Sequence, residues 1–518
     1  MDRVATSIAL RSGAGCGKTF VLARRFAELL RTSQGDDPLR DLVALTFTDK
    51  AALEMLARVR KTLADFAAGA SGEERKTLLN WIASLSEARI STIHAFCSGL
   101  LRAHAVEAGL DPGFAVCADK LVVSSMMSDA VEQAILESVS RPNSPAADLL
   151  ATLTFDRLHQ HITKLMMMRN NCPPQSYSDA DLIRKQWSAA RIECQAKAWK
   201  ALAHDPLFKA QINRLSSAVC DDPHDKLAAT RARIFELLAD VDEHGPRRQG
   251  IATELAGLHA TGGSDKKWGY KGATAEVRGL IKTIRDRFKD MVCWEQDFNK
   301  LDETSANALS QLSVLTAEAI EIYARQKRSQ GLLDFEDLLA HTRRLIEKSD
   351  SPLGGQIRQL LVDEAQDTNA FHIALLRSLL GADDKSNIAE GKLFVVGDVK
   401  QSIYRFQGAQ VEEFEALCRS LGPQNQESLD LSFRTHRGGV EFVNHLFAPL
   451  LDDYAPMQAH RSETPPGPSV EILLAAGSDE SPVYNAETAL AAQATVTAQR
   501  IAKMVADGER VVWDRSLE

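Results

Sequence analysis

A glycine-rich octapeptide near the start of the chain, Ser12 to Thr19, constrains the fold more than any other stretch. Its three glycines permit the backbone conformations that point successive N–H groups at one anion. The apolar run Val4 to Leu10 precedes it, and the residues from Phe20 to Leu30 follow it with helical spacing. Strand, loop and helix in this order predict a phosphate-binding loop at the N-terminus of a helix.

The residue types in the loop indicate its chemistry. Lys18 can reach the outer phosphates of a nucleotide, and the hydroxyl of Thr19 can hold Mg²⁺. The usual pattern begins with glycine, whereas this one begins with Ser12. The alternative is an ordinary glycine-rich turn between a strand and a helix. The residues expected to line the nucleotide are Gly13, Ala14, Gly15, Cys16, Gly17, Lys18 and Thr19.

Length and composition limit the class of protein. A chain of 518 residues is too long for one core, so two or three domains are expected. The net charge of −9 means that any nucleic-acid site must be a local basic groove. The eight cysteines are scattered without a C-x-x-C pair, which favours reduced thiols in a cytoplasmic protein. We expect no membrane segment and no signal peptide.

An acidic pair supplies the complement of the phosphate loop. Gln359 to Val362 reads as a short buried strand, and Asp363 and Glu364 follow it directly. Asp363 is suited to hold the metal, and Glu364 to position and deprotonate the attacking water. More than half of the chain separates this pair from Lys18, so an inserted region must divide two strands of one sheet. Strand signals nearly vanish from about Lys120 to Arg328, which predicts a helical insertion.

Other candidates follow predicted strands. Because ligands bind at the carboxyl ends of parallel strands, residues just past each strand share one edge of the sheet. In each case a structural role, in the core or on the solvated surface, is the alternative. The predicted strands and the candidates after them are Asp41 to Thr46 with Phe47, Arg89 to Thr92 with His94, Lys392 to Val396 with Gln401, Tyr404 and Phe406, and Ser428 to Phe433 with Arg434.

Three further segments carry predictions. Ser469 to Leu474 reads as another strand, and Glu487 to Ala506 as a helix. The segment from Lys266 to Lys271 mixes basic and aromatic residues, which suits a nucleic-acid backbone and a stacked base. It equally suits a solvated loop with Trp268 folded onto its neighbours.

The ordered set of motifs resembles the UvrD/Rep-type superfamily I DNA helicases. The resemblance rests on five segments at strand ends, and further segments resemble the AddA/RecB branch, the motor subunits of helicase–nuclease complexes. The five are Gly15 to Thr19, Thr46 to Met55, Asp363 to Thr368, Gly397 to Phe406 and Ser432 to Arg434. The further ones are Ser91 to Cys97, Gly109 to Pro112 and Leu333 to Phe335.

The resemblance implies roles for these positions. ATP and Mg²⁺ would be the cofactors, with Arg434 at the γ-phosphate and Phe433 on the adenine. Gln366 and Gln401 would couple the nucleotide to the DNA. Translocation would run 3′→5′ on single-stranded DNA from duplex ends, in break repair and recombination, with an AddB-like partner subunit. The residues along the single strand would be Phe47, His94, Tyr404 and Phe406.

The resemblance also implies a domain plan. It comprises a first RecA-like motor domain in two parts, residues 1–118 and 329–426, an all-helical insertion at 119–328, and the start of a second RecA-like domain at 427–518. No glutamine precedes Lys18, and the later family motifs are missing, so we expect a fragment. The alternatives are a non-catalytic DNA-binding or complex-forming subunit with a vestigial nucleotide site, and an ATPase that acts on RNA.

Overall fold

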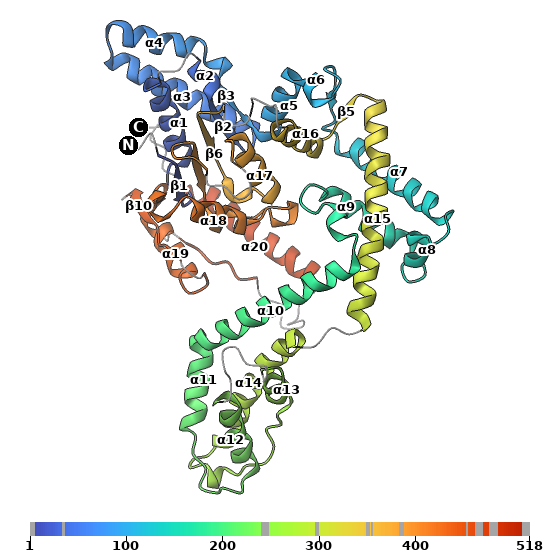
Figure 1. Cartoon of the computed structure of the whole chain (residues 1–518). Helices are drawn as coiled ribbons and strands as arrows, with labels where there is room; N and C mark the ends of the chain where they lie inside the picture. The colour runs from blue at the N-terminus through green and yellow to red at the C-terminus, as the bar shows by residue number, and fades with distance from the viewer. Residues whose placement is uncertain are drawn as a thin grey trace. The chain divides into compact units, whose positions relative to one another are not determined.

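The computed structural model describes residues 6–33, 37–239, 248–295, 300–348, 353, 356–382, 388–451, 454–461, 470–475 and 485–509. Contacts divide the chain into two units, residues 1–123 with 327–518, and residues 124–326 (Figure 1). Each unit is described by itself.

The first unit is built on a six-stranded parallel sheet with the strand order β3-β2-β6-β7-β1-β8. Leu45 of β2 pairs with Val362 of β6, which pairs with Val395 of β7. Because the strands run in register, their carboxyl ends meet along one edge, and the loops that leave them lie side by side. The predicted α/β class with a parallel sheet is confirmed.

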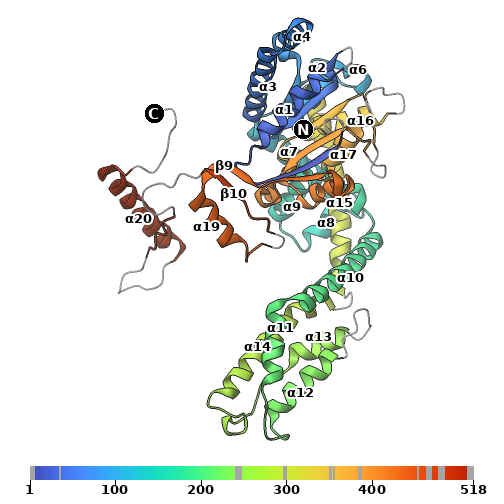
Figure 2. The same ribbon diagram turned by 90° about the vertical axis from the view of Figure 1, so that its left-hand side faces the viewer.

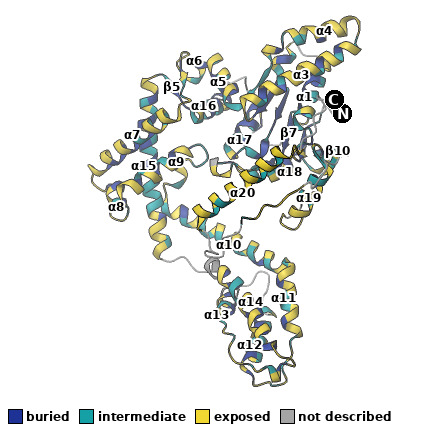
Figure 3. Cartoon of the chain, turned by 180° about the vertical axis from the view of Figure 1, so that it is seen from behind, coloured by how far each residue is buried: buried dark blue, intermediate teal, exposed yellow. Residues whose placement is uncertain are grey.

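Both faces of the sheet are covered by helices, as a buried parallel sheet requires. On one face the strand residues pack against α1, α3 and α4, and on the other against α5, α16, α17 and α18 (Figure 2). Neighbouring residues alternate between the two cores, since Val43 and Leu45 join one and Leu42 and Ala44 the other. Figure 3 shows buried residues along the strands.

The first unit contains the following strands and helices. The strands are β1 Ile8–Ser12, β2 Leu42–Thr46, β3 Arg89–Thr92, β4 Ala115–Val116, β5 Leu332–Leu333, β6 Gln359–Val362, β7 Leu393–Gly397, β8 Gln426–Leu429, β9 Leu431–His436 and β10 Gln458–Arg461. The helices are α1 Lys18–Arg31, α2 Pro38–Asp41, α3 Asp49–Gly69, α4 Gly72–Ala83, α5 Ile93–Ala103, α6 Ala105–Ala108, α16 Phe335–Glu347, α17 Ala370–Leu379, α18 Val411–Ser420, α19 Arg437–Phe447 and α20 Ala486–Ala506.

Two strand predictions near the end of the chain are wrong. The single strand expected from Ser428 to Phe433 is two strands that break at Asp430, since β8 pairs with β1 of the large sheet and β9 pairs with β10 in a separate two-stranded sheet. Residues 470–474 form no strand, and Leu474 is 82% exposed, because this apolar run has no partner strand among the described residues. Ser469 lies outside the described residues. The helix expected from Glu487 to Ala506 is α20.

The described part of the second unit is helical. Its helices are α7 Lys120–Val139, α8 Pro145–Leu150, α9 Phe155–Met167, α10 Ala180–His204, α11 Pro206–Ser217, α12 Lys226–Ala239, α13 Arg248–Gly257, α14 Ala273–Glu295 and α15 Lys300–Ser329, of which α7 and α15 cross the unit boundary. Throughout the described ranges of both units, the helices lack the combination of length and apolar character that a membrane span needs.

The segment from Lys266 to Lys271 is a folded loop of the second unit. Trp268 is only 3% exposed and packs in a core with residues of α10 to α14. Lys267 forms an ion pair of 2.5 Å with Asp222. A base cannot stack on Trp268, so the loop with the tryptophan folded onto its neighbours is the correct alternative.

Candidate functional site

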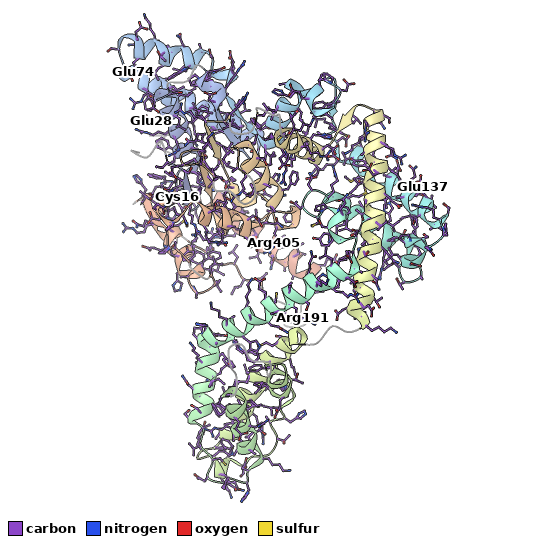
Figure 4. All side chains as sticks on the ribbon, in the orientation of Figure 1. Cys16, Glu28, Glu74, Glu137, Arg191 and Arg405 are labelled. Atoms are coloured by element: carbon purple, nitrogen blue, oxygen red, sulfur yellow. The ribbon has the colours of Figure 1, made fainter. Side chains whose placement is uncertain are left out.

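The glycine-rich loop leaves β1 and enters α1 at the carboxyl edge of the sheet. Gly15 and Gly17 have φ angles of 76° and 88°, a region that side chains with a Cβ rarely adopt. Gly17 is the N-cap of α1, so Lys18 and Thr19 begin the helix at its partially positive end. Cys16, labelled in Figure 4, is buried, and burial raises the pKa of its thiol. The backbone therefore has the form that a phosphate cradle requires.

Lys18 reaches across the edge of the sheet to the acidic pair. Its Nζ donates to Oε2 of Glu364 at 2.7 Å, and the Lys18 side chain is 11% exposed. It also donates to Oε1 of Gln401 at 3.4 Å. The structure thus brings together three predicted site residues from the loops after β1, β6 and β7.

The acidic pair sits in a strained turn at the end of β6. Glu364 has a φ of 49°, one of two non-glycine residues with a positive φ in the described chain. Such strain persists only where the surroundings fix it, and it gathers at functional sites. Asp363 is 8% exposed, and burial together with the Glu364 carboxylate raises its pKa to about 6.

The raised pKa makes a stability prediction for Asp363→Asn. The charged carboxylate is disfavoured in the fold, so the protein loses stability as pH rises through the interval from 3.8 to about 6, and the amide does not. The difference corresponds to roughly 3 kcal/mol at most. Urea unfolding at pH 7.5 should therefore find the variant more stable than the unmodified chain. At pH 4 the two should agree within error.

The exposed Asp65 of α3 supplies the control for that measurement, since Asp65→Asn should leave stability unchanged at both pH values. Equal stability of the Asp363→Asn variant and the unmodified chain at pH 7.5 would contradict the assignment of a disfavoured carboxylate.

Amide side chains connect the acidic pair to the loop after β7. Gln366 donates from Nε2 to Glu364 Oε2 at 2.9 Å and accepts from the backbone N–H of Asp398 at 2.9 Å. Gln401 donates from Nε2 to Asp398 Oδ2 at 2.8 Å. Hydrogen bonds therefore link Lys18 and Glu364 to the start of the loop that carries Tyr404 and Phe406.

The phosphate loop also contacts β9. Phe433 donates its backbone N–H to the carbonyl of Gly15 at 2.9 Å, and Ser432 Oγ donates to the carbonyl of Ala14 at 3.3 Å. A Cβ on Gly15 would lie 2.6 Å from Cβ of Arg434, so the approach needs glycine. Successive side chains of a strand point to opposite faces, so Phe433 and Arg434 lie on opposite faces of β9 where it contacts the loop.

Aromatic rings form a row beside this site. Phe47 follows β2 and stacks on Tyr404, with 5.3 Å between ring centroids and 23° between planes. Tyr404 lies 6.2 Å from Phe406, which is 80% exposed, and Phe47 is 47% exposed. Exposed apolar rings in a row form a surface on which bases can stack.

His94 lies in a different group of rings. It is half-buried after β3, with its ring centroid 4.9 Å from Phe335 and 6.4 Å from His372. Burial lowers the pKa of His94 and, with His94 nearby, lowers that of His372 to about 4. The ring contacts described for His94 therefore do not include the Phe47, Tyr404 and Phe406 row.

Sequence reasoning missed Phe335, His372 and His460 as residues of this edge. Phe335 appeared only within a motif, although its place directly after the N-cap Asp334 could have marked it as the exposed start of a helix. His460 lies in β10, whose sequence Gln-Ala-His-Arg has no strand pattern. The sequence carries no signal for His372 apart from its position beyond the acidic pair.

The residues present fit a magnesium nucleotide. The loop offers backbone N–H groups at a helix N-terminus for phosphates, and Lys18 offers a cation. Thr19 and Asp363 offer hard oxygen ligands, which Mg²⁺ prefers. The buried carboxylate of Asp363, disfavoured when charged, is the group that a metal cation would stabilise most.

Comparison with known proteins gives one family match. The model of the UvrD/REP helicase N-terminal domain matches residues 2–421. This region includes the phosphate loop, the acidic pair and the aromatic row, and ends before β8.

The curated relatives are each named as one subunit of an ATP-dependent helicase/nuclease. The protein of Listeria innocua is 28% identical over 500 residues, which cover 86% of this chain and 38% of the relative. That of Ligilactobacillus salivarius is 23% identical and that of Geobacillus kaustophilus 26% identical, each over 98% of this chain and 44% of the relative. The chain thus spans about two fifths of the length of these relatives.

Proposed function

Since the chain belongs to the UvrD/REP helicase family, we propose that it is the ATP-hydrolysing part of a DNA helicase of the AddA kind. The observation that carries the proposal is the Lys18–Glu364 pair of 2.7 Å, which joins the phosphate loop to the acidic pair at one edge of the sheet. Family members use this arrangement for nucleotide hydrolysis, and the aromatic row lies beside it.

The proposed roles follow from the contacts. The γ-phosphate of ATP replaces Glu364 as the partner of Lys18, which frees the carboxylate to accept a proton from the attacking water. Thr19 and Asp363 hold Mg²⁺, which neutralises charge on the phosphates. Arg434 stabilises charge on the transferred phosphoryl group, and Gln401 senses its presence.

The coupling to DNA uses the amide bridge. Loss of the γ-phosphate changes the partners of Lys18 and Glu364, and Gln366 and Gln401 pass this change to the loop of Tyr404 and Phe406. Bases of single-stranded DNA stack along this row with Phe47, and His94 contacts the same strand. The polarity is 3′→5′, as in the family.

The domain plan and the partner belong to the proposal. Residues 1–118 and 329–426 form the first RecA-like domain, 119–328 the helical insertion, and 427–518 the start of the second RecA-like domain. The cytoplasmic protein acts on single strands at duplex ends in break repair, with a subunit like AddB. We do not favour the non-catalytic alternative, since Lys18, Thr19, Asp363 and Glu364 are all present.

The test is hydrolysis of ATP by the 518-residue chain with and without single-stranded DNA. We expect DNA to stimulate turnover. If the chain binds DNA but hydrolyses no ATP with or without it, the proposal is wrong and the non-catalytic alternative holds. Stimulation by RNA but not by DNA of the same length would replace it by the RNA-dependent alternative.

Phe406→Ala should weaken the DNA effect without harming the fold. The ring is 80% exposed, so its removal costs little stability, whereas one stacked base is worth about 1–3 kcal/mol. The DNA concentration that gives half-maximal stimulation should rise at least about fivefold, with basal turnover unchanged. Leu79→Ala on α4 is the control, since Leu79 is an exposed apolar residue outside the row. An unchanged half-maximal concentration would remove Phe406 from the DNA site.

A further inference from the structure

A second aromatic ring lies beside Phe433. β10 runs parallel to β9, with Gln458 opposite Leu431 and Ala459 opposite Ser432. The register then shifts, since Arg461 lies opposite His436, and His460 falls at this irregularity with its ring beside Phe433. The two ring centroids are 4.7 Å apart, with 36° between the planes.

The backbone that carries His460 is fixed by other residues. Asn444 of α19 accepts from the N–H of Met457 at 3.0 Å and donates to its carbonyl at 2.8 Å. The sulfur of Met457 lies 2.7 Å from the position that a Cβ on Gly13 would take. The start of β10 therefore rests against both α19 and the phosphate loop.

Both rings remain open to solvent at this anchored place. Phe433 is 52% exposed, and His460 also belongs to the exposed residues. An aromatic pair in the core is covered by other side chains, whereas this pair is exposed, and Phe433 itself donates its backbone N–H to Gly15 of the phosphate loop. A flat heteroaromatic base stacks well on such rings, and an imidazole adds a polar edge.

We propose that His460 is a nucleobase-contacting residue that forms, with Phe433, a two-ring platform for the base of ATP. The inference rests on the proposed function of the phosphate loop and adds a residue to that site. It makes β10 part of the nucleotide site, although the matched family region ends at residue 421.

The experiment compares two ligands of the 518-residue chain. Displacement of a fluorescent ATP analogue labelled on the ribose gives the dissociation constants of ATP and of inorganic triphosphate, which has no base. His460→Ala should weaken ATP about fivefold, as expected for the loss of one aromatic contact, and should leave triphosphate unchanged. His460→Phe should restore most of the ATP affinity. His445→Ala, an exposed histidine of α19, is the matched control.

Two results would overturn the inference. Unchanged ATP affinity in His460→Ala excludes contact with the base. An equal loss for ATP and triphosphate means that His460 supports the phosphate loop instead. Failure of the proposed nucleotide site itself looks different, since the unmodified chain would then bind neither ATP nor triphosphate.

Discussion

Glu364→Gln should lower ATP turnover about 1,000-fold while the chain still binds ATP. A positioned base contributes about 10²–10⁴ to the rate, and the amide cannot take the proton from water. The amide oxygen can still accept the hydrogen bond from Lys18, which is 2.7 Å from the carboxylate in the unmodified chain. Glutamine also tolerates the φ of 49° as well as glutamate does, so the turn should keep its form.

Affinity separates this result from a damaged fold. Lys18 no longer faces a carboxylate in the variant, so the dissociation constant of ATP should fall or stay equal. Single-turnover hydrolysis and equilibrium binding, measured on the same preparation, check the lowered turnover and the retained affinity. Glu441→Gln on the exposed side of α19 is the control for removal of one acidic charge. Turnover within tenfold of the unmodified chain would exclude Glu364 as the base.

The sequence predicts well which residues lie at the carboxyl edge of the sheet. The strands Arg89–Thr92 and Gln359–Val362 match the predicted bounds residue for residue. The residues after them therefore meet along one edge, as expected for Lys18 and Glu364. The residues around Lys18 and around Glu364 do not predict that these two side chains form an ion pair, because they lie more than half of the chain apart.

The region after β8 was predicted less well for a physical reason. The run from Ser428 to Phe433 is apolar enough for one strand, but its halves pair with different partners, β1 and β10. Strand patterns report burial of side chains and not the identity of the neighbour. β10 itself alternates between exposed and half-buried positions, so no apolar periodicity marks it.

The ring contacts show the same limit. The stack of Phe47 on Tyr404 needs the loops after β2 and β7 to bend toward each other over β6, which strand order alone does not dictate. Likewise, the sequence does not predict that the ring neighbours of His94 are Phe335 and His372. Both placements are tertiary, and both decide which rings a base can reach.

Lys18→Ala should weaken ATP binding at least about 100-fold, since a charge-assisted hydrogen bond to phosphate is worth about 1.5–3 kcal/mol and Lys18 can make more than one. Lys61→Ala at an exposed position of α3 is the control and should leave the affinity unchanged. Lys18→Arg keeps the positive charge but replaces the compact ammonium with a planar guanidinium, so this variant should also bind ATP poorly. Displacement of a fluorescent nucleotide measures all three variants.

Lys18→Ala should also lower the stability of the fold. Without Lys18, the carboxylates of Glu364, Asp363 and Asp367 lose their nearest cation, and burial together with Glu364 already raises the pKa of the other two to about 6. Lys18→Ala should therefore unfold at lower urea concentration at pH 7.5, and Glu364→Gln in the same chain should restore much of this loss without restoring ATP binding. Recovery of ATP binding in the double variant would show that Lys18 acts only by holding Glu364, and not on the phosphates.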